Sequence, residues 1–199
     1  MQEVASPYRR ENGTSLIEIK LGYVHQLFNS FDPSPFHEKD LDPEAESYIV
    51  GATREFPIGA PLKLVFYLPP EQMALAAAVD LAGSIHNYFD YRLKVTTRDL
   101  SFQLRQGRLS LVIGLGFLIA CIVLRQVFFA HPQDMLSRIV AEGLLISGWV
   151  AMWRPINIFL YDWWPVRRQA RVYAKLSRMQ VETRVAPSPP PAAPAPPAA

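Results

Sequence analysis

Residues 109–124 read LSLVIGLGFLIACIVL, sixteen residues without a charge between Arg108 and Arg125. As an α-helix this block would be roughly 24 Å long, short of a hydrocarbon core of about 30 Å. The two flanking arginines can reach toward opposite membrane surfaces, and the apolar residues that follow Arg125 prolong the block. The stretch therefore predicts a first transmembrane helix over residues 108–130.

A second apolar block, LLISGWVAMW, lies between Glu142 and Arg154. An α-helix over residues 139–153 would be roughly 22 Å long, with Arg138 before it and Arg154 after it. The chain that joins the two blocks is short, so the two helices must run antiparallel. We therefore expect a second transmembrane helix over residues 139–154. An outer loop over residues 131–138 would complete a transmembrane helical hairpin.

Small residues recur at four-residue spacing in both blocks. Such spacing lets helix backbones approach closely in lipid. The pattern predicts that the two helices touch through Gly116, Ala120, Gly143, Ser147 and Ala151.

The distribution of basic residues predicts the orientation of this hairpin. Arginine and lysine cluster before the first block and after the second, whereas the loop between them offers only Arg138, with Arg125 at its edge. Because short segments rich in these residues stay in the cytosol, we expect both termini there. The amino terminus, MQEVASPYRRENGTS, has no apolar run of the kind found in a cleaved secretory signal.

The segment after Arg154 predicts a helix that lies in the membrane interface. Pro155 cannot donate a backbone hydrogen bond, which favours a break there. Apolar residues from Ile156 to Trp164 then recur at helical spacing, as in an interfacial amphipathic helix beside anionic lipid headgroups. The expected interface residues are Arg108, Arg125, Arg138, Arg154, Trp163, Trp164, Arg167 and Arg168. One continuous span to Tyr161, with Arg154 buried in it, is the alternative.

Glu142 is a candidate intramembrane functional acid, because it lies about one turn inside the second block. An isolated carboxylate is costly there, and acids in such positions often handle ions or protons. Arg138 is four residues earlier on the same helix face, so a structural ion pair between the two is the other interpretation.

The residues before the first block predict a cytosolic domain with the element order β-α-β-α. LIEIKL at residues 16–21 alternates as a half-buried strand does, and LKLVFYL at 62–68 indicates a buried strand. Between them Asp42 and Pro43 are typical of a helix start. From Pro70 the pattern predicts a long helix that leads into the membrane. Because a crossover favours parallel pairing and two strands make a poor sheet, we expect a partner subunit to complete the layer, which suggests a homo-oligomer.

These elements together predict an α+β membrane protein with seven segments. A flexible N-terminus covers residues 1–13, and the cytosolic α/β domain with its stalk helix covers 14–107. The two spans and their loop follow, as bounded above. An interfacial and basic cytosolic helix covers 155–182, and a disordered proline/alanine tail covers 183–199.

The acidic loop FDPSPFHEKDLDPEAE, residues 31–46, is the stretch closest to a chemical site. Its weak candidates for metal ligands are Asp32, His37, Glu38 and Asp40. Prolines and aspartates are equally typical of an exposed structural or docking loop. Because the chain lacks the common catalytic and nucleotide-binding motifs, we expect no catalytic residue and no cofactor. A net charge of +2 argues against a nucleic-acid binder, and Cys121 is expected to be a small packed residue.

Two segments, LFNSFDPSPFHEKDLDPEAESYIV at 27–50 and EGLLISGWVAMWRPINIFLYDWWP at 142–165, resemble a group of small two-span bacterial membrane proteins. The resemblance implies a place in the bacterial inner membrane but carries no activity or site. The leading hypothesis is a non-enzymatic protein that scaffolds or docks partners at that membrane. The alternatives are an oligomeric ion channel or transporter component, and a membrane-bound metal-dependent enzyme that uses the acidic loop.

Overall fold

The computed structural model describes residues 8–128 and 134–187 of the chain. The fold is α+β, with one four-stranded sheet and two long apolar helical segments. The chain divides into two compact units. Met1–Arg92 together with Val172–Ala199 form the first, called the α/β unit, and Leu93–Arg171 form the second, called the hairpin unit. Residues 188–199 of the expected tail and residues 131–133 of the expected outer loop lie outside the described residues.

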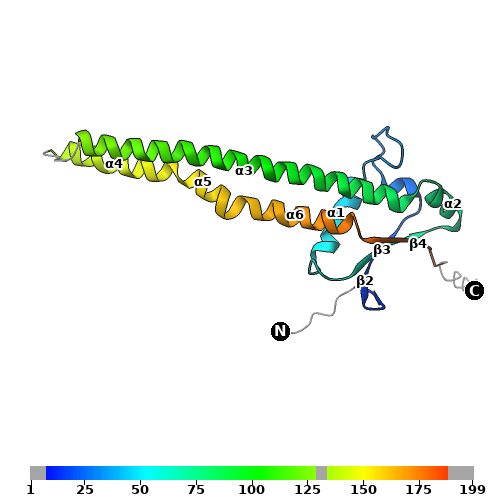
Figure 1. The fold of residues 1–199 in the computed structure, drawn as a ribbon. Coiled ribbons are helices and arrows are strands. Elements are labelled where there is room, and N and C mark those ends of the chain that lie inside the picture. Colours follow the sequence, from blue (N-terminus) through cyan, green and yellow to red (C-terminus); the bar gives the residue numbers. More distant parts are fainter. Residues whose placement is uncertain (1–7, 129–133, 188–199) are drawn as a thin grey trace, which may run out of the picture. The chain divides into compact units, whose positions relative to one another are not determined.

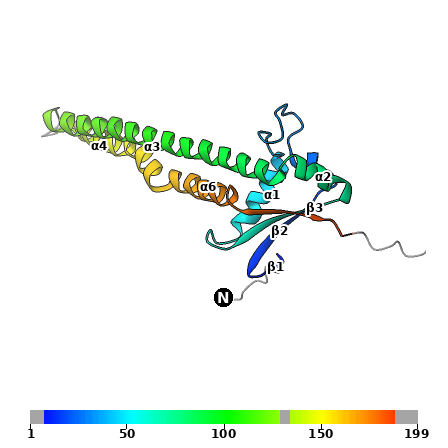
Figure 2. The same cartoon turned by 45° about the vertical axis from the view of Figure 1, so that its right-hand side comes forward.

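The sheet of the α/β unit has the strand order β1-β2-β3-β4 (Figures 1 and 2). The strands are β1 (Arg10–Glu11), β2 (Thr14–Lys20), β3 (Leu62–Leu68) and β4 (Gln180–Val185). The two strands expected from the sequence are β2 and β3, and they pair in parallel as expected. β4 pairs in parallel with β3, and β1 pairs antiparallel with β2.

Residues 8–13, which were expected to be flexible, instead begin the sheet. Asn12 and Gly13 have φ values of 50° and 79°, so both lie in the left-handed region. An Asn-Gly pair in that conformation makes the tight turn that suits the twist of a β-hairpin. This turn reverses the chain between β1 and β2, and the backbone N–H of Leu16 donates to the carbonyl of Arg9.

β4 corrects the expectation for the C-terminal part. The sequence predicted a helix to residue 182 and then a disordered tail, but the helix ends at Leu176 and a strand follows. The chain returns beside β3, where the backbone groups of residues 180–185 find partners. The chain therefore completes its own sheet, which removes the argument that a partner subunit must do so.

Helices cover one face of this sheet. α1 (Pro43–Arg54) begins as predicted, with the side chain of Asp42 accepting from the backbone of Glu44 and Ala45. A 3-10 helix, η1 (Val24–Leu27), precedes it, and α2 (Pro70–Ala78) follows β3. The fully buried side chains include Phe66, Phe89, Ile85, Leu64 and Leu176, so both the first turns of α3 and the last turn of α6 belong to this core.

Two helical segments contribute to the hairpin unit. The first is α3 (Leu81–Phe128), which is separated from α2 by Asp80 at a φ of 44°. The second runs through α4 (Met135–Ala151), α5 (Trp153–Asn157), the π-helix η2 (Ile158–Asp162) and α6 (Trp163–Leu176). Both segments are long and apolar enough to cross a membrane. Figures 1 and 2 show α3 and α4 side by side.

Of the small residues that the sequence predicted at the contact between α3 and α4, Ala151 lies there, with its carbonyl beside Gly114, whereas Gly116, Ala120, Gly143 and Ser147 are exposed. An added Cβ would meet nothing within 4 Å at Gly116 or Gly143. Buried positions instead recur every seven residues, at Gly107, Gly114 and Cys121 on α3 and at Ala141, Gly148 and Pro155 on the second segment, where Ile158 is buried as well. A seven-residue period keeps one stripe facing a partner along two long helices, which a four-residue period does not.

The break near Arg154 differs in two respects from the predicted one. The irregular turn falls at Met152, and Pro155 is buried just after it. Beyond it the chain does not leave α3, because a Cβ added at Gly107 would lie 2.6 Å from Cγ2 of Ile158. The residues that were expected to start an interfacial helix therefore continue beside α3.

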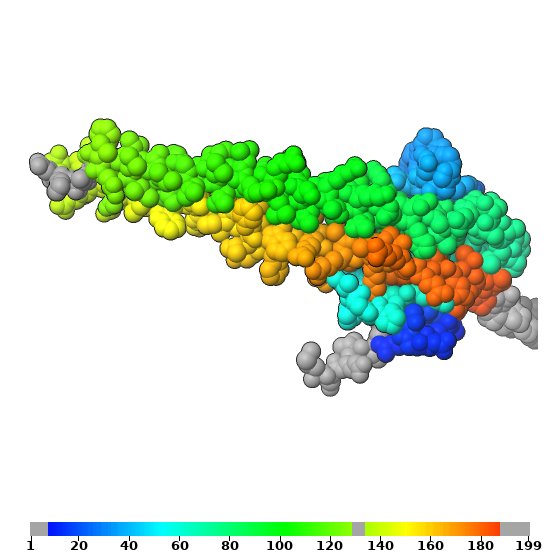
Figure 3. All heavy atoms as spheres, in the orientation of Figure 1, coloured from blue at the N-terminus to red at the C-terminus, as the bar shows by residue number. Residues whose placement is uncertain are grey.

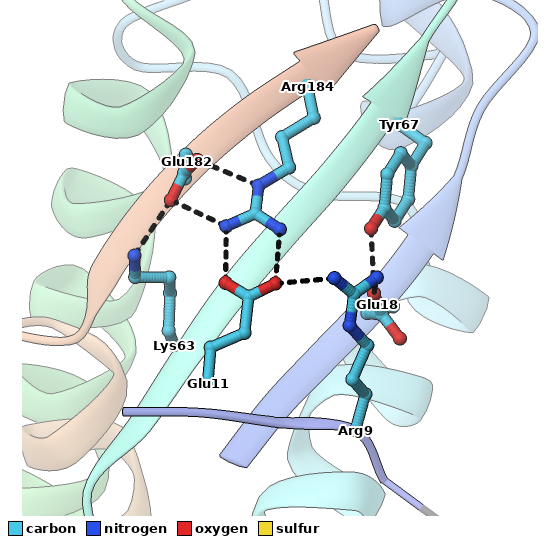
Figure 4. A network of polar contacts seen from close by, with 7 residues as sticks. All are labelled: Arg9, Glu11, Glu18, Lys63, Tyr67, Glu182 and Arg184. Carbon is cyan, nitrogen blue, oxygen red and sulfur yellow. Dashed lines mark hydrogen bonds and ion pairs between the residues drawn. The ribbon is translucent and has the colours of Figure 1, made fainter. Parts of the chain in front are cut away.

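An ionic network joins the side chains of β1 to those of β4. It lies on the face of the sheet that is turned away from α3 (Figure 4). The guanidinium of Arg184 donates to both carboxylate oxygens of Glu11, at 2.9 and 2.7 Å, and to Glu182 at 2.7 Å. Lys63 donates to Glu182 at 2.7 Å. The hydrogen bonds from Arg184 and then Lys63 lower the pKa of Glu182 to about 2, and those from Arg184 lower the pKa of Glu11.

This network predicts an acid-sensitive part of the stability. A carboxylate whose pKa is lowered by folding stabilises the fold at pH values above its pKa in the unfolded chain, about 4.3 for glutamate. This contribution is lost as the pH falls toward the pKa in the folded chain. We therefore expect Arg184→Gln to lower the free energy of unfolding at pH 7, with a difference from wild type that narrows below about pH 4. Denaturant titrations followed by far-UV circular dichroism at several pH values would measure it.

Arg10→Gln is the matched control, because Arg10 is an exposed residue of β1 outside the network. Its difference from wild type should be small and independent of pH. A difference for Arg184→Gln that stays constant down to pH 2 would contradict the assignment.

Candidate functional site

The acidic loop of the sequence folds as a closed loop, Phe28–Leu41, which stands out from the surface of the α/β unit (Figure 3, light blue). An isolated antiparallel bridge joins Phe28 to Leu41 at its base. The backbone N–H of Asn29 donates to the carbonyl of Asp40 at 2.8 Å, just above that bridge. Loops whose ends meet in this way are often functional surfaces.

Asp32 organises the interior of the loop. Its carboxylate accepts from the backbone N–H of Asp40 at 2.7 Å and from that of Ser34 at 2.9 Å. These backbone hydrogen bonds lower the pKa of Asp32, since they favour the charged form. The carboxylate thus shapes the loop, as a short acidic side chain in a turn commonly does.

The four weak candidates for metal ligands do not form one ligand set. Nε2 of His37 lies 3.5 Å from Oε1 of Glu38, with both side chains exposed, while Asp32 is occupied inside the loop. Within residues 8–128 and 134–187, no three side chains of His, Cys, Asp or Glu are arranged to hold a metal ion. The loop therefore offers exposed polar side chains, at His37, Glu38 and Asp40, and no enclosed cation site among those residues.

Aromatic contacts fix one side of the loop and leave the other side exposed. The ring of Phe36 stacks on His25 with centroids 5.2 Å apart and meets Phe28 edge-on at 5.3 Å. Asn87 of α3 donates to the carbonyl of His37 at 3.2 Å. Phe31, in contrast, is 94% exposed. A large apolar side chain held out by an ordered loop is a common anchor in protein interfaces.

A second cluster joins three helices within the α/β unit, and sequence reasoning missed it. The carboxylate of Glu46 on α1 accepts from the hydroxyl of Tyr88 at 2.7 Å and from Nε of Arg92 at 3.0 Å, both on α3. It also accepts from the hydroxyl of Tyr173 on α6 at 2.8 Å. Arg92 lies over the ring of Tyr173, 5.4 Å from its centroid.

This Glu46 cluster holds the ends of both long helices to α1. The side chain of Glu46 is only 16% exposed, and burial together with the bond to Glu46 raises the pKa of Tyr88 well above its ordinary value. A buried carboxylate that accepts from three donors holds the three helices together strongly, because hydrogen bonds to a charged group are stronger than hydrogen bonds between neutral groups. The sequence signal was the spacing of Tyr88 and Arg92, four residues apart on one helix face. Glu46 itself was explained only by the helix start.

The predicted interface residues fall on the hairpin unit, most of them exposed. Arg108, Arg125, Arg138, Arg154, Arg167 and Arg168 are exposed, and so is Trp164. Trp163 is half-buried. Its indole N–H donates to the carbonyl of Phe159 at 2.8 Å, and the guanidinium of Arg167 lies 5.4 Å from the centroid of its ring. The contact of Gly107 with Ile158 puts Arg108 and Arg154 at heights that differ by only about 5 Å along the helix pair.

Glu142 and Arg138 both lie on the surface of α4. Among the described residues neither side chain has an ion-pair or hydrogen-bond partner, so the predicted pair between them is not formed. Arg125 on α3 does not pair with Glu142 among the described residues either.

Comparison with family models, curated proteins and solved structures found no match. Proposals about function therefore rest on the sequence and geometry of this chain. Two features carry them: the ordered loop with Phe31 in the α/β unit, and the two apolar helical segments of the hairpin unit.

Proposed function

We propose that this chain is a non-enzymatic protein of the bacterial inner membrane whose cytosolic α/β unit docks partner proteins and which works as a homo-oligomer. The observation that carries the proposal is the Phe28–Leu41 loop. It is ordered by Asp32 and Phe36, yet it presents Phe31 almost fully exposed. An apolar anchor on a loop that also exposes Glu38 and Asp40 suits a partner with an apolar pocket and a basic rim.

The membrane part of the proposal rests on the hairpin unit. Its two segments have the length and hydropathy of membrane spans, and their apolar side chains are largely exposed. Arg108 and Arg154 lie at nearly one height and would mark the cytosolic surface. The basic residues of α3 and α6 beyond that height would contact anionic headgroups, with both chain termini in the cytosol.

Site-specific photocrosslinking tests the docking proposal. A benzoylphenylalanine at position 31 of the full-length protein in native membranes should capture one protein reproducibly. The same probe at Ile58, an exposed apolar residue in the turn before β3, should not capture it. Once that partner is identified, Phe31→Ala should weaken its binding at least about tenfold, as loss of an interface anchor does.

The decisive comparison is between Phe31→Ala and Ile58→Ala. Equal affinity of both variants for the captured partner, or no position-specific capture at 31, would overturn the docking proposal. Such a result would leave the membrane proposal untouched, because solvent labelling of cysteines along α3 tests that separately.

A further inference from the structure

α4 carries a second stripe of residues, which does not face α3. Met135, Arg138, Glu142, Leu145 and Trp149 follow one another at alternating steps of three and four residues. This is the spacing of a coiled-coil seam. The contact with α3 uses the neighbouring face of α4, at Ala141 and Gly148, about a quarter turn round the helix, and Leu145 at the edge between the two faces is half-buried. Met135 is 80% exposed and Trp149 is 59% exposed, and Arg138 and Glu142 are exposed too, so the stripe apart from Leu145 is uncovered within one chain.

Two opposite charges lie side by side in this α4 stripe. Arg138 and Glu142 are one helical turn apart, about 6 Å along the axis. Both are exposed, and each side chain lacks an ion-pair or hydrogen-bond partner within the described residues of its own chain. In the membrane that we propose for this segment, an unpaired carboxylate facing lipid is costly. The arrangement calls for an external partner that supplies a positive group beside Glu142 and a negative group beside Arg138.

We propose that the α4 stripe binds the same stripe of a second copy of this chain, in a parallel two-fold pair. A two-fold axis makes contacts reciprocal, so Arg138 of each copy meets Glu142 of the other. The stripe is self-complementary, because it supplies both charges from positions one turn apart. All copies cross the membrane in one direction, so the two α4 helices run parallel as a coiled-coil seam allows. This inference rests on the proposed membrane location and names the interface of the proposed homo-oligomer.

The charge pattern favours a second copy over lipid and distinguishes α4 from α3. An anionic headgroup would pair with Arg138 but would repel Glu142. The outer face of α3 carries no charge between Arg108 and Arg125, and so offers no partner to Glu142. Polar contacts between membrane helices provide specificity as well as affinity, and here they set the register of the two copies.

Charge exchange tests this interface in the full-length protein. Energy transfer between labelled copies in liposomes measures association over a range of protein-to-lipid ratios. Arg138→Glu and Glu142→Arg should each weaken dimerisation about tenfold or more, because each places like charges across the seam. The double variant should restore it to within about threefold of wild type. Arg125→Glu, on α3, is the matched control and should leave dimerisation unchanged.

Cysteine crosslinking locates the interface independently of any charge. Cys121→Ala removes the single native thiol of the chain. On that background, cysteines at positions 145 and 149 should form disulfide-linked dimers, whereas cysteines at 116 and 143 should not. Dimers crosslinked at 116 or 143, or no rescue by the double charge variant, would overturn the α4 interface and leave a homo-oligomer standing. A wild type that stays monomeric at every protein-to-lipid ratio would overturn both the interface and the proposed homo-oligomer.

Discussion

Glu46→Gln is expected to lower the free energy of unfolding of the α/β unit by about 2–4 kcal/mol. The substitution removes the charge that three donors share, from Tyr88, Arg92 and Tyr173. The glutamine amide has the same shape, but its single oxygen cannot accept all three hydrogen bonds. Its N–H groups would face other donors and could not bond to them. Arg92 is partly exposed and can recover some solvation, which keeps the loss below that of a fully buried pair.

The measurement is denaturant unfolding in detergent, followed by hydrogen exchange of the amides at the start of α3. Glu44→Gln is the matched control, because Glu44 is an exposed acid two residues earlier on α1. It should cost under about 1 kcal/mol, the size of a helix-dipole effect. Equal losses in the two variants would show that Glu46 acts only on its own helix and does not join α1 to α3 and α6.

The parts of the fold that the sequence predicted depend on local patterns. The cap at Asp42 and the alternation within β2 are complete within a few residues, and so is the apolar block at 109–124. Each of these patterns can be recognised without knowing the tertiary structure, because periodicity and capping depend only on residues that are close in sequence.

β4 could not be predicted in the same way, because its partner lies far along the chain. The bond between Lys63 and Glu182 joins residues that are 119 positions apart. The alternation of Val181, Thr183 and Val185 is too short to be distinctive between a basic helix and a proline-rich tail. The β1 hairpin was different, since Asn12-Gly13 is a strong turn signal that was available in the sequence.

In the candidate site, too, the features set by local sequence could be predicted and those set by distant residues could not. The loop at 28–41 could be recognised from its composition, but the role of Asp32 depends on which backbone groups turn toward it. Glu46 was assigned to the helix start because a first-turn acid needs no further explanation. Its donors come from α3 and α6, which only the folded chain brings together.

Gly114→Leu is expected to separate α3 from α4 at a cost of about 2–3 kcal/mol. A Cβ added at Gly114 would lie 2.9 Å from the carbonyl oxygen of Ala151. Pro155, four residues after Ala151, has no N–H to donate to that carbonyl, so the oxygen is free to face α3. A backbone atom cannot move aside as the end of a side chain can. The helices must part, or the turn at Met152 must rearrange.

Cys121 reports that separation, because it lies seven residues after Gly114 on the same stripe and is only 2% exposed. In detergent, Gly114→Leu should raise the rate of maleimide labelling of Cys121 at least about tenfold, since about 1.4 kcal/mol of easier opening is a tenfold change. Gly116→Leu is the matched control: it adds the same side chain two residues away, where nothing lies within 4 Å. It should leave the labelling rate near that of wild type, because its side chain points away from α4. Equal rates of Cys121 labelling in the two variants would mean that the seven-residue stripe does not hold α3 against α4. The four-residue pattern predicted from the sequence would then be the contact to test.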